Sequence, residues 1–247
     1  MDVKKLLLLV CTLVFTGRVS AACTFGSGSG EPTLQSVFDS TLGNGALNAA
    51  DCIADDRTWS VPAQLDATIV IELAGFASQN RFGVYSVDSP SERFTLFDGP
   101  DSAGADSTIR FTTTDGGYRV SVNGREEGKL SGDRLGFFLA TPTGNVFYGD
   151  PALNGDRFDH LYAYGGTGGD FVGGPLAGTS FATGMYLLAF EDLVAKKADR
   201  DYQDFVALVN FGVPVPLPAS IWLLGVALAL SFVAMRMRTC VLKPSWE

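Results

Sequence analysis

The central part of the chain alternates short apolar runs with clusters of Gly, Asp, Asn, Ser and Pro. The runs are rich in aromatic and β-branched residues, and no helical periodicity is convincing over more than a turn or two. The expected strands are residues 67–73, 81–87, 93–97, 107–113, 118–122, 135–140, 145–148, 160–163, 185–191 and 205–211. Short strands at this spacing predict an all-β domain over residues 23–212, with a β-sandwich or jelly-roll-like fold.

Two Asn-Gly pairs indicate turns in this series. Asn123-Gly124 directly follows the expected strand at 118–122, and Asn154-Gly155 precedes the expected strand at 160–163. Asn and Gly both tolerate the positive φ that a two-residue hairpin turn requires. Each pair therefore predicts a hairpin turn.

The N-terminal residues have the layout of a secretory signal peptide. Lys4 and Lys5 form a positive start, an apolar run spans residues 6–15, and small residues occupy 20–22. The apolar run is too short for a transmembrane helix, which needs about 20 residues. We therefore expect residues 1–22 to direct export and to be removed, with acylation of Cys23 as the alternative form of processing.

The C-terminal residues predict a membrane anchor. Residues 219–235 carry no charge, and at ~1.5 Å per residue a helix of this length spans about 26 Å, enough to cross the hydrocarbon core. Arg236 and Arg238 begin a basic tail, residues 236–247, which the positive-inside rule places in the cytoplasm. The expected precursor crosses the inner membrane once, with its N-terminus outside.

Proline alternates with apolar residues just before this span. The prolines predict an extended, stiff spacer over residues 213–218. The spacer overlaps a motif made of Val215, Pro216, Leu217, Pro218 and Ala219. Motif, span and basic residues in this order resemble the Val-Pro-Leu-Pro-Ala variant of the PEP-CTERM sorting signals. The resemblance implies an exosortase-type transpeptidase as partner, cleavage near the motif, and delivery to the cell surface or an extracellular polymer matrix.

Charge and cysteine content add to this picture of an exported domain. Residues 22–212 contain 25 acidic and 12 basic residues. This excess disfavours nucleic acid and anionic lipid as partners and favours cations, although solubility alone is the simpler explanation of the bulk charge. Only Cys23 and Cys52 fall on the expected outer side, where oxidising conditions favour a disulfide between them.

Five carboxylates gather where the last two expected strands meet: Glu191, Asp192, Asp199, Asp201 and Asp204. Like charges this close repel one another unless a cation or an arginine compensates them. Carboxylate oxygens are ligands that suit calcium. The spacing is not that of an EF-hand, because the twelfth position from Asp199 is Asn210. Two explanations stay open, namely bound calcium or counter-charges from Lys196, Lys197 and Arg200.

Parts of residues 80–211 resemble a family of exported domains of unknown function, family 4114. The matching segments are residues 82–85, 147–155, 190–193 and 199–204, together with the surroundings of His160. The last two segments read Phe-Glu-Asp-Leu and Asp-Arg-Asp-Tyr-Gln-Asp, and the family usually has Asn in place of Gln203. The resemblance implies a β-rich exported module that often accompanies surface-sorting tags and has no established activity.

The sequence does not favour an enzyme. Residues 178–184, with Ser180, resemble the nucleophile segment of subtilisin-like proteases, which also need a histidine base and an orienting carboxylate. The single histidine, His160, lacks the Gly-Thr-His context of that family. His160 is either an ordinary side chain or a metal ligand together with Asp150, Asp156 and Asp159. No pair of carboxylates stands out as the acid and base of a glycosidase.

These features together predict a non-enzymatic surface module that binds or organises extracellular polysaccharide, with calcium stabilising the acidic segment. One alternative is a surface glycan hydrolase that uses other acidic residues. The other alternative is a structural surface protein without a ligand.

Overall fold

The computed structural model describes residues 23–26, 32–73, 76 and 79–212. The expected signal peptide at 1–22, the Pro-rich motif at 213–219, the span at 219–235 and the tail at 236–247 lie outside these residues. Within the described part of the chain, no helix combines the length and apolar character needed to cross a bilayer.

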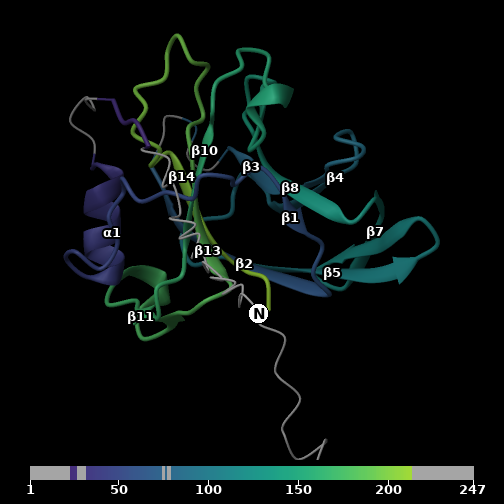
Figure 1. Ribbon diagram of the computed structural model, residues 1–247, viewed down its shortest axis with the longest axis horizontal. Helices are drawn as coiled ribbons and strands as arrows, with labels where there is room; N and C mark the ends of the chain where they lie inside the picture. Colours follow the sequence, from purple (N-terminus) through teal and green to yellow (C-terminus); the bar gives the residue numbers. More distant parts are fainter. Residues whose placement is uncertain (1–22, 27–31, 74–75, 77–78, 213–247) are drawn as a thin grey trace, which may run out of the picture. The chain divides into compact units, whose positions relative to one another are not determined.

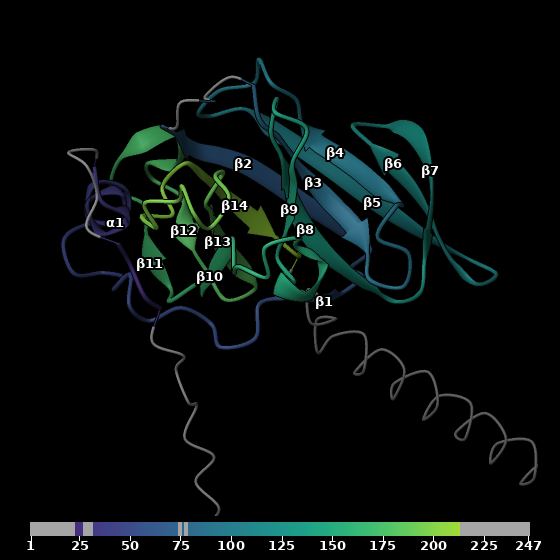
Figure 2. The ribbon, with the colours of Figure 1, turned by 90° about the horizontal axis from the view of Figure 1, so that it is seen from above.

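Two antiparallel sheets contain most of the strands (Figures 1 and 2). The five-stranded sheet has the order β1-β8-β3-β4, with β9 also paired to β8. Its strands are β1 (Trp59–Ser60), β3 (Arg81–Ser86), β4 (Arg93–Phe97), β8 (Arg134–Ala140) and β9 (Val146–Tyr148). The seven-stranded sheet has the order β10-β13-β14-β2-β5-β6-β7. Its strands are β2 (Gln64–Glu72), β5 (Asp106–Thr114), β6 (Gly117–Val122), β7 (Arg125–Ser131), β10 (Leu161–Gly165), β13 (Met185–Phe190) and β14 (Phe205–Asn210).

Smaller elements complete the described residues. Strands β11 (Gly169–Asp170) and β12 (Ser180–Phe181) form a two-stranded sheet. Helix α1 spans Leu34–Leu42, and two 3-10 turns, η1 (Pro151–Leu153) and η2 (Gly174–Leu176), lie in connections. The expected all-β class is confirmed, and each of the ten expected strands is present within a few residues of its predicted bounds.

Helix α1 contradicts the expectation that no helix exceeds a turn or two, because it has nine residues. Thr33 caps its first turn by accepting a hydrogen bond from the backbone N–H of Ser36 at 3.2 Å. Leu34, Phe38 and Leu42 recur every four residues and are all buried. The helical pattern is thus present in the sequence, but it extends over a segment too short to be distinctive.

The two Asn-Gly pairs behave differently. Asn123 and Gly124 have φ values of 50° and 81° and join β6 to β7, whose residues Val122 and Arg125 pair. The hairpin expected at Asn154-Gly155 is wrong, since β9 pairs with β8 and β10 pairs with β13. The Asn154 side chain instead bonds to the backbone of Tyr148 and Phe158 and so folds the connection onto itself.

Strands β13 and β14 are buried on both faces. Leu188 and Phe190 belong to the hydrophobic cluster that joins the two large sheets, whereas Leu187 and Ala189 belong to a second cluster with helix α1. The alternation follows from the strand period of two residues. Burial on both faces explains why these strands read as continuous apolar runs rather than as alternating patterns. A carboxylate adjoins each run, because Glu191 directly follows β13 and Asp204 directly precedes β14.

We predict that Phe82→Ala lowers the free energy of unfolding by about 3–5 kcal/mol. The Phe82 side chain is fully buried between the sheets, and its ring lies 5.1–6.1 Å from the rings of Phe97, Phe137, Phe190 and Phe205. Urea unfolding of the variant measures the loss. Val172→Ala is the control, because 64% of Val172 is exposed and its truncation should change stability by less than about 0.5 kcal/mol. A loss below about 1 kcal/mol for Phe82→Ala would contradict this account of the core.

Candidate functional site

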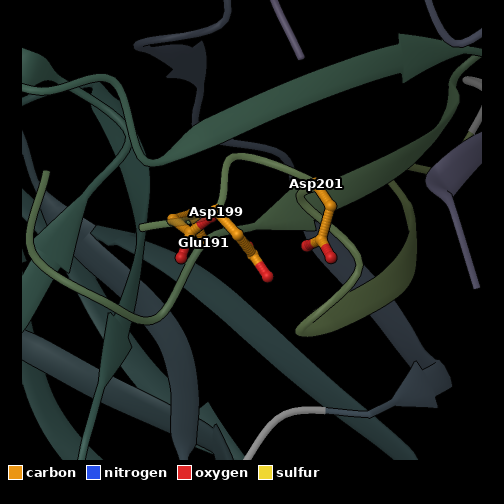
Figure 3. A group of neighbouring side chains, drawn as sticks. All are labelled: Glu191, Asp199 and Asp201. Atoms are coloured by element: carbon orange, nitrogen blue, oxygen red, sulfur yellow. The ribbon is translucent and has the colours of Figure 1, made fainter. Parts of the chain in front are cut away.

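The connection between β13 and β14 holds all five of the carboxylates singled out from the sequence. Phe190 and Phe205 are paired across these two strands, so Glu191 and Asp204 lie directly beyond the pair. Figure 3 shows the side chains of Glu191, Asp199 and Asp201 gathered on this connection. These acids therefore lie close together, as the sequence predicts.

The acids form two overlapping groups. In each group, one oxygen from every member lies within 4.8 Å of the others. The first group is Glu191, Asp199 and Asp201, and the second is Glu191, Asp192 and Asp204. Glu191 belongs to both, and within the two groups only Asp199 is more than slightly exposed. Such spacing is short enough for the members of one group to share a cation.

Hydrogen bonds to the backbone hold these carboxylates in place. Glu191 Oε2 accepts from the N–H of Arg200 at 3.0 Å, and Asp204 Oδ2 accepts from the N–H of Asp192 at 2.9 Å. Arg200 and Tyr202 both have positive φ, 64° and 56°, which is uncommon outside glycine. The two left-handed residues fold the connection back so that the carboxylates on either side of them lie close to Glu191.

Burial makes full ionisation of this set unfavourable. Desolvation, followed by the charge of Asp199, raises the pKa of Glu191 to about 7. Desolvation, followed by the charges of Asp192 and Glu191, raises the pKa of Asp204 to about 9. Without a compensating cation, the site therefore retains protons near neutral pH. A bound cation would replace those protons.

In the described structure, the basic residues of the connection do not neutralise its carboxylates. Arg200 is exposed, and its guanidinium lies 5.2 Å from the ring centroid of Phe158. Lys196 and Lys197 are also exposed. Among the described residues, no ion pair involves Glu191, Asp199 or Asp204.

Asn80 adds an oxygen that sequence reasoning missed. Its side chain is 3% exposed, and its Nδ2 donates to Asp192 Oδ2 at 3.0 Å. Its Oδ1 is buried and has no hydrogen-bond partner among the described residues. An amide oxygen of this kind is a ligand that calcium accepts. Asn80 and Asp192 are 112 positions apart, so no local pattern could have linked them.

His160 supports the same connection but is not part of either acidic group. It is fully buried, Nδ1 lies 3.0 Å from the carbonyl oxygen of Glu191, and Nε2 lies 3.2 Å from Asp156 Oδ2. Desolvation lowers the pKa of His160, so the imidazole is neutral at pH 7. Among the described residues, no group of three candidate metal ligands contains His160, so its interpretation as a ligand with Asp150, Asp156 and Asp159 gains no support.

The protease resemblance gains no support from these contacts. Ser180 lies in the short strand β12, where it pairs with Asp170 of β11. The described hydrogen bonds of His160 go to Glu191 and Asp156 and not to Ser180.

An N-terminal segment covers the acidic connection from outside. A disulfide joins Cys23 to Cys52, with their Cα atoms 6.1 Å apart. The N–H of Gly26 donates to the carbonyl oxygen of Arg200 at 3.0 Å. A side chain at Gly26 would collide with the backbone oxygen of Asp199, so only glycine permits this approach. Residues 23–26 thus tie the acidic connection to the rest of the domain.

The chain matches no protein-family model, no curated protein and no solved structure. The likeness to the family of unknown function and to the sorting signals therefore stays a prediction from the residues themselves.

We predict that the free energy of unfolding falls between pH 7 and pH 9 when a chelator removes divalent cations. A carboxyl whose pKa is higher in the folded than in the unfolded chain keeps its proton longer when folded. The stability that this proton contributes is lost as the pH rises from the unfolded pKa, 3.8 for Asp, to the folded pKa, about 9 for Asp204. In this window the neutral His160 makes no contribution of opposite sign.

Asp204→Asn should reduce this pH dependence, because an amide retains the acceptor for the Asp192 N–H and has no proton to lose. The remaining slope comes in part from Asp56, since burial raises the pKa of Asp56 to about 8. Asp170→Asn is the control, since Asp170 is an exposed residue of β11. Urea unfolding at several pH values measures both variants. Equal slopes for Asp204→Asn and the unaltered chain would contradict the assignment of the raised pKa to Asp204.

Proposed function

We propose that this chain is an exported, non-enzymatic surface module with a jelly-roll-like β-sandwich fold. In this proposal, the acidic connection binds a divalent cation, and the domain binds or organises extracellular polysaccharide. The observation that supports the cation site is the presence of two clusters of three acids each, both including Glu191, at the ends of two buried strands.

Calcium is the cation whose chemistry fits these side chains. Calcium takes six to eight oxygen ligands and tolerates irregular geometry. The connection supplies five carboxylates, and Asn80 adds a buried amide oxygen beside Asp192. The raised pKa values of Glu191 and Asp204 mean that, without a cation, the site must hold protons or bear repulsion, and calcium relieves both. The ion would therefore stabilise the fold and make the connection rigid.

Three features support an extracytoplasmic location. A disulfide such as Cys23–Cys52 persists in oxidising compartments. The N-terminal residues have the layout of a signal peptide, and residues 215–219 resemble a sorting motif followed by an apolar span. The proposed route is export, insertion as a single-pass precursor in the inner membrane, and processing by an exosortase-type transpeptidase at the cell surface or in the matrix.

A glycan hydrolase is the weaker alternative. Glycosidases place two carboxylates across a sugar-binding cleft. Glu191 and Asp204 have the raised pKa values of such groups, but both are buried, and neither lines the clefts described on this domain. The same carboxylates are better placed to hold an ion than to reach a polymer.

We predict that millimolar calcium raises the melting temperature of the chelator-treated chain. At about 100 times its dissociation constant, calcium would add about 2.7 kcal/mol to the stability of the folded state, or about 5–10 °C in melting temperature. The double variant Asp199→Asn, Asp201→Asn should lose most of this shift, because it removes two of the negative charges of the first acidic group. Differential scanning calorimetry with and without calcium measures the difference.

The matched control is the double variant Asp115→Asn, Asp170→Asn, which changes the charge equally at two exposed positions outside the site. Its calcium shift should equal that of the unaltered chain. Equal shifts for both double variants would exclude the acidic connection as the calcium site. No shift in the unaltered chain would favour a structural protein without this ligand.

We also predict two forms of the chain in its native cells, a membrane-bound precursor and a processed surface form. After processing, the surface fraction should contain a protein whose intact mass ends near Pro218 and is about 2 Da below the reduced value because of one disulfide. Intact mass spectrometry of membrane and surface fractions checks this. A surface form that retains residues 221–247 would contradict the sorting proposal and leave a simple membrane anchor.

A further inference from the structure

A cleft of about 1010 Å³ lies away from the acidic connection. The connection from α1 to β1 forms one side of it, and the ends of β10 and β13 form the other. Its lining includes two aromatic residues, Trp59 and Tyr186, and the disulfide residue Cys52. The volume is at the upper end of the range typical for ligand sites.

The two aromatic side chains form an edge-to-face pair, with ring planes 70° apart, that is only partly covered. Trp59 and Tyr186 are half-buried, their ring centroids lie 6.3 Å apart, and both pack against Phe211. Tyr186 pairs across the sheet with Gly165, which has no side chain to cover the ring. A Cβ at Gly165 would lie 3.8 Å from the Tyr186 ring and 3.9 Å from Ile53. The glycine therefore keeps the cleft open beside the tyrosine.

Polar groups surround these two rings. Asn48, Asp51 and Asp55 are exposed on the α1–β1 connection, and Thr167 and Thr183 face them from the strand ends. Carboxylates, amides and hydroxyls bind sugar hydroxyls, whereas aromatic faces pack against the apolar C–H face of a sugar ring. The charged residues of this lining are both acidic, which favours an uncharged chain over an anionic polymer.

The cleft is held in shape by bonds below its surface. The Cys23–Cys52 disulfide fixes the α1–β1 connection, and the N–H of Ile53 donates to the carbonyl oxygen of Ala163 at 2.8 Å. The hydroxyl of Tyr164 donates to the carbonyl oxygen of Ala49 at 2.8 Å. A site fixed before the ligand arrives loses less conformational entropy on binding.

We propose that this cleft binds a neutral polysaccharide, with Trp59 and Tyr186 as two differently oriented aromatic contacts for sugar rings and Asn48, Asp51 and Asp55 as hydrogen-bonding partners. The proposal rests on the polysaccharide-binding function above and assigns it to a place on the domain. It is independent of the calcium site, because the two sets of residues do not overlap.

Tryptophan fluorescence of the full chain tests the assignment. The chain has three tryptophans, so Trp222→Phe and Trp246→Phe leave Trp59 as the sole reporter. The purified protein, in a detergent without a sugar headgroup, is titrated with soluble β-glucan, galactomannan, xylan and dextran, and with anionic alginate. We expect saturable quenching or a spectral shift with at least one neutral polymer and none with alginate.

Two variants of this reporter protein examine the cleft. Tyr186→Ala removes one of the two aromatic contacts, and Gly165→Leu fills the space beside the Tyr186 ring. Each should raise the dissociation constant at least about tenfold. Tyr118→Ala is the matched control, because Tyr118 is a half-buried tyrosine of β6 outside the cleft and should leave the affinity unchanged. Circular dichroism and melting check that each variant folds, and Gly165→Leu decides the matter if Tyr186→Ala does not fold.

The outcomes distinguish polysaccharide binding by the protein from the assignment of that binding to this cleft. Binding that both cleft variants weaken and Tyr118→Ala does not supports the assignment. Binding that persists in a folded Gly165→Leu variant overturns the cleft while the polysaccharide function stands. Absence of binding to all four neutral polymers overturns both the polysaccharide function and the cleft. Binding to alginate with equal affinity overturns the preference for uncharged chains.

Discussion

Burial of β13 and β14 on both faces is the constraint on which the rest of this domain depends. One face contributes to the core between the two large sheets, and the other packs with helix α1. A slip of one residue would exchange the two faces and move Phe190 out of the core between the sheets. The register of the two strands is therefore strongly specified, and so are the positions of Glu191 and Asp204, which lie just beyond their paired ends.

This placement has an electrostatic consequence. The carboxylates lie at the end of a buried hairpin, where desolvation raises the pKa values of Glu191 and Asp204 and the charges of neighbouring carboxylates add to the effect. The surrounding structure holds them there, with the His160 ring against the backbone of Glu191 and residues 23–26 against the backbone of Asp199 and Arg200. A set of acids that is so firmly held cannot spread apart to relieve repulsion. A proton or a cation must do so.

The same strands separate the two proposed sites. Tyr186 lies near the start of β13 and Glu191 follows its end, so about 17 Å of strand lies between them. The Cys23–Cys52 disulfide connects the two regions, since Cys52 lines the aromatic cleft and Cys23 begins the segment that covers the acidic connection. Strand β13 and the disulfide thus connect the aromatic cleft to the acidic connection within one domain.

Local patterns in the sequence determined the all-β class, ten of the strands, the turn at Asn123-Gly124 and the five acids of the connection, because each depends on neighbouring residues. Only the tertiary structure decided that Asn80 lies beside Asp192, that His160 contacts the backbone of Glu191, and that Trp59 and Tyr186 share a cleft. These contacts join residues far apart along the chain. Strand order creates them, and that order follows from the packing of two sheets and a helix around common cores, which hydrophobic periodicity does not encode.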